Sequence, residues 1–263
     1  MPELPEVEAY RRLAEAAALG RRIRAVEAPD PWFLKGGLVA AEVEGALTGA
    51  RLVAARRRGK LLLLDTDPGR TLGLRFGMTG RLVVDGVGGV DLLLYTSGRD
   101  EPAWDRFTLH FGRGGRLRVN DPRRLGGVVL DTDEERLGPD ALEATPAQLA
   151  AALAGSAAPL KARLMDQARL AGIGNLIADE VLWRAALSPL RPAGSLTPPE
   201  LRRLHRHLRS TVEDLIDRGG SHLGDLTPNR VRGGTCPRDR APLQRATVGG
   251  RTTWWCPKHQ RRR

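Results

Sequence analysis

The chain has 263 residues, enough for one large domain or two modest ones with real cores. No apolar stretch approaches the roughly 18–20 residues that a membrane span needs, and the acidic, proline-interrupted start is unlike a signal or transit peptide. We therefore expect a cytoplasmic protein, associated with the nucleoid if it binds DNA, and no membrane partner. Two cysteines do not indicate a disulfide scaffold.

The formal net charge of +11 is unevenly distributed. Residues 1–160 contain 22 basic and 22 acidic side chains, whereas residues 161–263 contain 20 basic and 9 acidic ones. A segregated basic half usually faces a polyanion, so the charge favours a nucleic-acid partner. The alternative is an arginine-rich proteome in which Arg merely replaces Lys.

The predicted elements change in kind along the chain. Residues 5–18 predict a helix, with Pro5 in its first turn. From residue 22 to about residue 130, short segments separated by Gly, Asp and Pro predict the strands of a sandwich or barrel. Helices are then expected at about 146–153, after 159, at 175–186 and at 198–218, followed by a hairpin with strands at 243–248 and 251–255.

This order predicts an α+β fold with three parts. The first part, 1–133, is an N-terminal β-sandwich domain that begins with a helix. The second, 134–227, is a helical domain, and the third, 228–263, is a small β-hairpin module. No internal repeat or low-complexity tract stands out.

The N-terminus carries the first candidate chemistry. Met followed by the small residue Pro2 is a sequence from which the initiator Met is normally removed, which leaves a secondary amine. An α-amine has a pKa near 8, and an adjacent helix N-terminus should lower it further. A neutral amine can attack an electrophilic carbon and form an iminium ion, and Glu3 is placed to act as a general acid or base. The alternative is an ordinary start codon before a capped helix.

A glycine-rich turn between two predicted helices offers a second site. Gly172, Gly174 and Asn175 lie in the segment Ala-Gly-Ile-Gly-Asn. Glycines let the backbone approach a ligand closely, and the following helix N-terminus presents free N–H groups, as a phosphate site requires. An ordinary helical turn is the alternative.

The C-terminal module has the spacing of a zinc ribbon or finger. Cys236 and Asp239 are separated by two residues, as are Cys256 and His259, and sixteen residues lie between the pairs. Asp and His can both bind zinc, but this ligand set is uncommon. The alternatives are a hairpin that folds without metal and a disulfide between the two cysteines. Arg251 follows the Gly-Gly turn and should project from the hairpin tip.

Three further stretches are candidates for weaker reasons. Met78 lies between glycines in a turn and is either a core side chain or a residue that inserts into DNA. Arg123 and Arg124 follow a Pro turn that could equally be solvated. Lys60 begins a predicted strand that is otherwise apolar. A single lysine at this place could equally be a solvated charge at the edge of a sheet.

Together these stretches resemble the formamidopyrimidine-DNA glycosylase/endonuclease VIII family, nearly end to end and in order. The start of the chain is similar to the formamidopyrimidine branch, 57–60 to the segment with the active-site lysine, and 77–80 and 121–126 to the loops that insert into DNA. Residues 164–175 resemble the helix-two-turn-helix motif, and the hairpin resembles the zinc finger.

The resemblance implies a bifunctional DNA glycosylase and abasic-site lyase of base excision repair that acts on damaged double-stranded DNA through β,δ-elimination. It also implies one zinc ion, no nucleotide cofactor and a monomer. The resemblance implies four catalytic residues: Pro2 as nucleophile, Glu3 as acid and proton shuttle, and Lys60 and Arg251, which together with Asn175 hold the phosphates beside the lesion. The implied DNA-binding residues are Asn175, its neighbour Gly174 and Arg124, with Met78, Arg123 and Leu125 inserting into the DNA. The implied zinc ligands are Cys236, Asp239, Cys256 and His259.

Three departures from the family pattern matter. Leu125 stands where the formamidopyrimidine branch usually has Phe. Asp239 and His259 replace two zinc cysteines. Only 15 residues separate Gly220 from Cys236, a stretch that is longer in that branch and holds a loop over a flipped 8-oxoguanine. We therefore expect oxidised or ring-opened purines as substrates, with weaker 8-oxoguanine activity. The alternatives are endonuclease VIII-like action on oxidised pyrimidines and abasic sites, a non-catalytic damaged-DNA-binding protein, and an RNA-binding ribbon protein.

Overall fold

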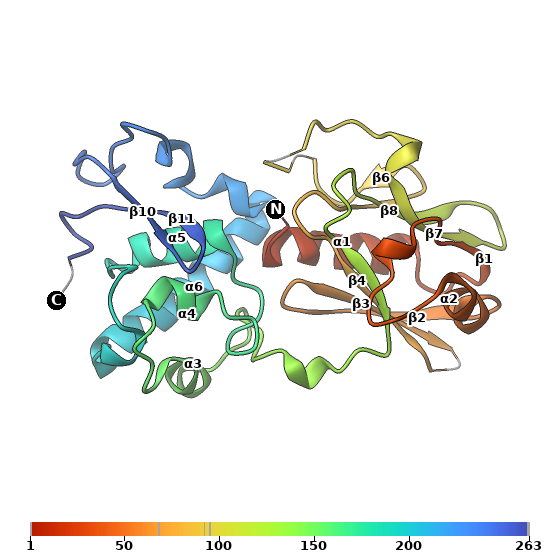
Figure 1. The fold of residues 1–263 in the computed structure, drawn as a ribbon, viewed down its shortest axis with the longest axis horizontal. Coiled ribbons are helices and arrows are strands. Elements are labelled where there is room, and N and C mark those ends of the chain that lie inside the picture. Colours follow the sequence, from red (N-terminus) through yellow and green to blue (C-terminus); the bar gives the residue numbers. More distant parts are fainter. Residues whose placement is uncertain (1, 68, 92, 95, 262–263) are drawn as a thin grey trace. The chain divides into compact units, whose positions relative to one another are not determined.

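The computed structural model describes residues 2–67, 69–91, 93–94 and 96–261. The chain divides between Glu134 and Glu135 into two compact units (Figure 1). No helix among these residues is long and apolar enough to cross a bilayer. The α+β fold class is confirmed, with the strands of the first unit followed by the helices and hairpin of the second.

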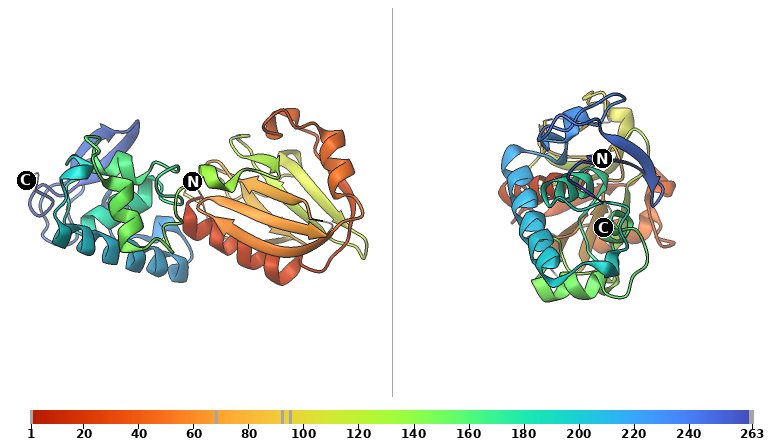
Figure 2. Two further views of the ribbon diagram at one scale, coloured as in Figure 1. Left: turned by 90° about the horizontal axis from the view of Figure 1, so that it is seen from below. Right: turned by 90° about the vertical axis from the view of Figure 1, so that its left-hand side faces the viewer.

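The first unit contains two antiparallel sheets, visible as stacked layers in Figure 2. One has five strands in the order β1-β7-β8-β5-β6, and the other has four in the order β2-β3-β4-β9. The strands are β1 (Ile23–Glu27), β2 (Arg51–Arg58), β3 (Leu61–Asp67), β4 (Thr71–Arg75), β5 (Arg81–Val84), β6 (Val87–Gly88), β7 (Asp105–Phe111), β8 (Arg116–Asn120) and β9 (Gly127–Leu130).

Helix α1 (Leu4–Ala17) packs against β2 and β3 of one sheet and β5 of the other. Its buried Val7, Tyr10 and Ala14 recur at helical spacing and therefore share one face. The Tyr10 ring lies 4.4 Å from the ring of Phe76, and its hydroxyl donates to the Gly80 carbonyl at 3.1 Å. The core of this unit thus fixes the helix that follows Pro2.

Two strand expectations need correction. A second helix, α2 (Ala40–Leu47), interrupts the segment that we expected to form only strands. Its sequence is rich in Ala and Glu, and the Glu42 carboxylate accepts from the Val39 N–H at 3.1 Å, so local helix formation prevails there. The stretch of expected strands also includes residues 91–95. Residues 92 and 95 lie outside the described residues, and the other three are in no strand.

The second unit contains four helices among its described residues and a two-stranded hairpin. Helix α6 has the capping Thr197 and Glu200 at its start and ends at Gly219, whose φ of 96° is a left-handed helix cap. Helix α5 packs against both α6 and the second strand of the hairpin. The bounds are α3 (Pro146–Leu153), α4 (Leu160–Leu164), α5 (Asn175–Arg184), α6 (Pro198–Arg218), β10 (Gln244–Val248) and β11 (Arg251–Trp255).

Candidate functional site

Pro2 and Glu3 lie immediately before the first turn of α1. The backbone N–H of Glu3 donates to Oε2 of Glu6 at 2.8 Å, and Glu3 itself is buried. The positive end of α1 disfavours a second positive charge at the adjacent Pro2 nitrogen. The start of α1 therefore places a buried carboxyl group one residue from Pro2.

The turn that carries Lys60 is tied to the same helix. Gly59 and Lys60 join β2 to β3, and Gly59 has a φ of 58°, a conformation that glycine adopts without strain. Arg57 donates from Nη1 to the Gly59 carbonyl and from Nε to Oε2 of Glu8, each at 3.1 Å. Because the Arg57 and Glu8 side chains are only 4% and 10% exposed, this pair holds the Lys60 turn firmly against α1.

Glu8 remains ionised in this environment. Burial alone would raise its pKa, but hydrogen bonds and charge from Arg11 and Arg57 outweigh burial and lower it. The ionised carboxylate keeps the pair with Arg57 intact at neutral pH, and with it the position of the Lys60 turn.

The two loops expected to insert into DNA form one rigid assembly around Asp121. The fully buried Asp121 carboxylate accepts from the hydroxyl of Thr79 at 2.5 Å and from the N–H groups of Leu125 and Gly126, both at 2.9 Å. A Cβ on Gly77 would lie 2.4 Å from the carbonyl carbon of Leu125, so only glycine permits this approach. Side chains on the two loops are therefore held in fixed relative positions.

These loops expose different side chains to different degrees. Met78 is half-buried, Arg123 is exposed and Leu125 is 48% exposed. Arg124 instead makes two hydrogen bonds of 2.6 Å to the carboxylate of Asp30, and this contact lowers the pKa of Asp30. Met78, Arg123 and Leu125 are thus better placed to enter DNA than Arg124, whose guanidinium anchors the loop.

In the second unit, Gly174 is the N-cap residue of α5 and Asn175 is its first residue. The Asn175 side-chain oxygen accepts from Nζ of Lys161 at 2.6 Å. That bond orients the amide and directs its NH₂ group away from Lys161. The Asn175 side chain therefore presents donors, as a phosphate site requires.

A buried ionic cluster of Lys161, Asp179 and Arg230 supports this turn and was missed by the sequence analysis. The Lys161 and Asp179 side chains are both fully buried and lie 2.7 Å apart, and Arg230 donates to Asp179 at 2.9 Å. The sequence carries little signal for this cluster, because Lys161 is one of two charged residues in Leu160–Leu164 and Asp179 is one of three in Asn175–Arg184.

The same cluster holds the hairpin that carries Arg251. Nζ of Lys161 also donates to the carbonyl of Thr252 at 3.1 Å and to the hydroxyl of Thr253 at 2.9 Å, and the Trp254 N–H donates to Asp179 at 3.2 Å. Arg251 is exposed at the start of β11, directly after the Gly249–Gly250 turn. One buried cluster thus positions both Asn175 and the hairpin of Arg251.

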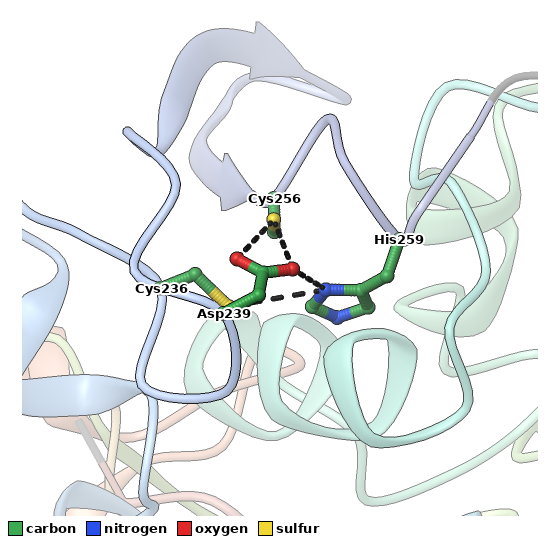
Figure 3. Close-up of side chains that lie close together, drawn as sticks. All are labelled: Cys236, Asp239, Cys256 and His259. Carbon is green, nitrogen blue, oxygen red and sulfur yellow. Dashed lines mark hydrogen bonds and ion pairs between the residues drawn. The ribbon is translucent and has the colours of Figure 1, made fainter.

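Cys236, Asp239, Cys256 and His259 come together as expected, with ligand atoms all within 4.8 Å of one another. Figure 3 shows the four side chains pointing toward a common centre. His259 Nδ1 lies 2.9 Å from Asp239 Oδ2 and 3.9 Å from Cys236 Sγ, and Cys256 Sγ lies 3.4 Å from both Asp239 oxygens. These separations bracket the roughly 3.3–3.8 Å between ligand atoms of tetrahedral zinc, so small side-chain movements would let the four donors hold a metal ion.

The surroundings of the cluster also suit a metal. Both cysteines are buried and free, so no disulfide joins them. The indole N–H of Trp183 donates to Cys236 Sγ at 3.3 Å, as expected for a group that supports a metal-bound sulfur. Burial raises the pKa of Cys256 to about 11, so a metal must displace a proton from this thiol to bind it.

Comparison with known proteins gives a consistent result. The family described as Formamidopyrimidine-DNA glycosylase N-terminal domain matches residues 1–128, and the Formamidopyrimidine-DNA glycosylase H2TH domain matches residues 137–226. The formamidopyrimidine-DNA glycosylase of Paracoccus denitrificans is 37% identical over 98% of this chain and 99% of the relative. That of Thermus thermophilus is 37% identical over 99% of this chain and 98% of the relative.

Solved structures of DNA-bound proteins are also similar to this chain over almost its whole length. The Lactococcus lactis Fpg, in a complex with DNA that contains an abasic site, superimposes with a TM-score of 0.83 at 27% identity over 99% of this chain and all of that chain. A MutM complex with DNA containing carbocyclic 8-oxo-G gives a TM-score of 0.83 at 28% identity over the same shares.

The fold, the Pro-Glu start and these similarities place the chain in the class of DNA glycosylases of base excision repair, with abasic-site lyase activity. Within that class, it belongs to the formamidopyrimidine-DNA glycosylase family.

Proposed function

We propose that the chain removes oxidised or ring-opened purines from duplex DNA by covalent catalysis at Pro2 and then nicks the strand by β,δ-elimination. The observation that carries this proposal is the intact Pro2–Glu3 pair at the start of a buried helix. The amine attacks C1′ of the damaged nucleotide and the base leaves with its bonding electrons. The C1′–O4′ bond then breaks as O4′ takes a proton, and the resulting iminium ion acidifies the C2′ hydrogen for elimination of the phosphates. Glu3 transfers protons to and from the sugar.

The remaining candidate residues bind the damaged DNA. Lys60, Asn175 and Arg251 hold phosphates beside the lesion, and Gly174 lets the backbone approach one of them. The base must leave the stack before its glycosidic bond can react, at a cost of a few kcal/mol. Met78, Arg123 and Leu125 fill the gap in the duplex.

The substrate class follows from the relatives, because related structures hold DNA that contains Fapy-dG or carbocyclic 8-oxo-G. Among these lesions, we propose that ring-opened purines are preferred. The chain from 221 to 235 is short and contains only two single turns of 3-10 helix, Ser221–Leu223 and Thr227–Asn229. It therefore has little length with which to cover a flipped 8-oxoguanine.

The experiment compares cleavage of duplexes with formamidopyrimidine, 8-oxoguanine, thymine glycol or an abasic site, and parallel reactions with borohydride test each duplex for a trapped covalent complex. We expect a trapped covalent complex on the abasic duplex and faster cleavage at formamidopyrimidine than at 8-oxoguanine. Faster cleavage at thymine glycol would favour an endonuclease VIII-like activity instead. DNA binding without any trapped complex would favour a non-catalytic damage-binding protein.

We also propose that the ligand cluster of Cys236, Asp239, Cys256 and His259 binds one structural zinc ion. The support is a set of four donors that fit a tetrahedral ion and leave no open position for catalysis. Zinc held there would fix the base of the hairpin whose far end carries Arg251.

For this zinc site, we expect about one equivalent of zinc in the purified protein, and Cys256→Ser to lower zinc affinity by at least about tenfold because a thiolate ligand is lost. Asp239→Cys should raise zinc affinity. Asp214→Asn, which removes a carboxylate outside the cluster, is the control and should change nothing. Elemental analysis and competition with a chelator measure both quantities, and less than about half an equivalent in the wild type would refute the site.

A further inference from the structure

A cavity of about 810 Å³ lies within the second unit, at the end of α5 opposite Asn175. Six cationic side chains line it, and one carboxylate, Glu200, is among its lining residues. The cationic residues are Arg184, Arg191, Arg203, Arg238, Lys258 and Arg261. Because α5 rises about 1.5 Å per residue, its ten residues place this cavity roughly 14 Å from the phosphate-binding turn.

Two of the six cations are neutralised by carboxylates. Arg184 bonds to Glu180, Asp214 and Asp225, and Arg191 bonds to Glu200 at 2.6 Å. These interactions build the wall of the cavity and do not leave a net positive charge there.

The other four cations have no carboxylate partner among the residues that the structure describes. Arg203 donates to the Ala185 carbonyl, Arg261 donates to the Lys258 carbonyl, and Arg238 lies 5.1 Å from the centre of the Trp183 ring. They come from three separate segments: helix α6, the turn before Asp239 and the turn at the C-terminal end of the chain. Four uncompensated charges from three segments therefore face one volume.

Two further observations indicate a positive potential at this place. Thr197, the N-cap of the 21-residue helix α6, lines the cavity, so the positive end of that helix is directed at it. His207 on the same helix has a lowered pKa, first through burial and then through the charges of Arg206, Arg238, Arg203 and Arg184. These charges oppose an additional cation and favour an anion.

We propose that this cavity, which we call the α5–α6 cationic cavity, binds an oligophosphate: two or three linked phosphate groups, either free or on a nucleoside. Guanidinium groups bind phosphate oxygens in pairs, and four cations match the charge of a triphosphate. The volume lies in the range of small-molecule sites, roughly 300–1,000 Å³. A concave site of this size suits a compact ligand better than the extended backbone of a DNA strand.

The test is a calorimetric titration of the full-length protein with inorganic triphosphate and, separately, with ATP, at constant ionic strength. We expect both ligands to bind saturably at one site, and equal concentrations of sulfate to bind much more weakly. The zinc content is measured before and after, because triphosphate also chelates metal ions. Absence of saturable binding would overturn the proposal.

Substitutions inside and outside the α5–α6 cationic cavity test whether triphosphate binds there. Arg203→Gln should weaken triphosphate binding about tenfold, since one charge-assisted contact is worth about 1.4 kcal/mol or more. Arg202→Gln removes the same charge from the adjacent, exposed position of α6, outside the cavity, and should leave binding unchanged. Lys258→Gln provides a second variant should the contact of Arg203 with Ala185 prove necessary for folding, and it should also weaken binding.

Three results would contradict the assignment. Equal weakening by Arg202→Gln would show a general charge effect, and weakening by Arg251→Gln would show that triphosphate occupies the proposed phosphate-binding surface for DNA. A loss of affinity for an undamaged oligonucleotide in Arg203→Gln, without triphosphate binding to the wild type, would assign the cavity to a nucleic-acid strand. Because the readout is binding, failure of this proposal leaves the glycosylase function untouched.

Discussion

Replacing Pro2 by Gly should lower strand cleavage at a formamidopyrimidine lesion by at least about a thousandfold and remove most of the borohydride-trapped complex. The substitution keeps an α-amine but converts it from secondary to primary. It also removes the ring that fixes the nitrogen before the first turn of α1. A freely rotating amine attacks C1′ less often, and its imine lacks the permanent positive charge of a proline iminium ion.

Glu3→Gln is the matched control for Pro2→Gly because it preserves the shape of the neighbouring side chain and leaves the amine intact. We expect it to lower base release by about a hundredfold or more while still trapping on a preformed abasic site, where no base has to leave. Intact mass measurement must show that Met1 has been removed from each variant. If Pro2→Gly traps as efficiently as the wild type on the same abasic duplex, Pro2 is not the nucleophile.

Local sequence signals predicted most of the elements that carry the candidate site. The helix after Pro2 was expected at 5–18 and runs from Leu4 to Ala17. The hairpin was placed within one residue at each strand end, because the Gly249–Gly250 turn specifies it locally. The pairing of Cys236 and Asp239 with Cys256 and His259 also followed from spacing, since a hairpin brings its two ends together.

Interactions between distant segments could not be predicted in this way. Arg57 and Glu8 form a buried pair across 49 residues, and Asp121 joins two loops that are 42 residues apart. Helical or strand periodicity reports only which residues share a face of one element. It contains no information on which buried charges meet, so the supports of Lys60 and Leu125 became visible only in the structure.

The buried cluster of Lys161, Asp179 and Arg230 is the place where a single substitution should damage stability most. Asp179→Asn keeps the size of the side chain but leaves two buried cations without a counter-charge. We expect it to lower the free energy of unfolding of the second unit by about 3–5 kcal/mol, the usual cost of breaking a buried ion pair from one side. Thermal or denaturant unfolding of the full chain measures this loss.

Lys161→Met should cost less, because Asp179 retains Arg230 and the methionine fills most of the volume of the lysine. Combining Lys161→Met with Asp179→Asn should restore part of the stability lost in Asp179→Asn alone, since one of the two unpaired cations is then removed. The control is Asp214→Asn in the same unit. Because the Asp214 side chain is 37% exposed, its loss should lower the free energy of unfolding by at most about 1 kcal/mol.

The cluster also connects stability with DNA binding, because Lys161 orients the Asn175 amide and bonds to the hairpin that carries Arg251. At a temperature where Lys161→Met is still folded, its affinity for abasic-site DNA should therefore fall by at least about tenfold, the value of one charge-assisted contact. Asp214→Asn should bind this DNA like the wild type. If Lys161→Met is destabilised but binds DNA with unchanged affinity, the cluster supports the fold alone and does not position the phosphate-binding residues.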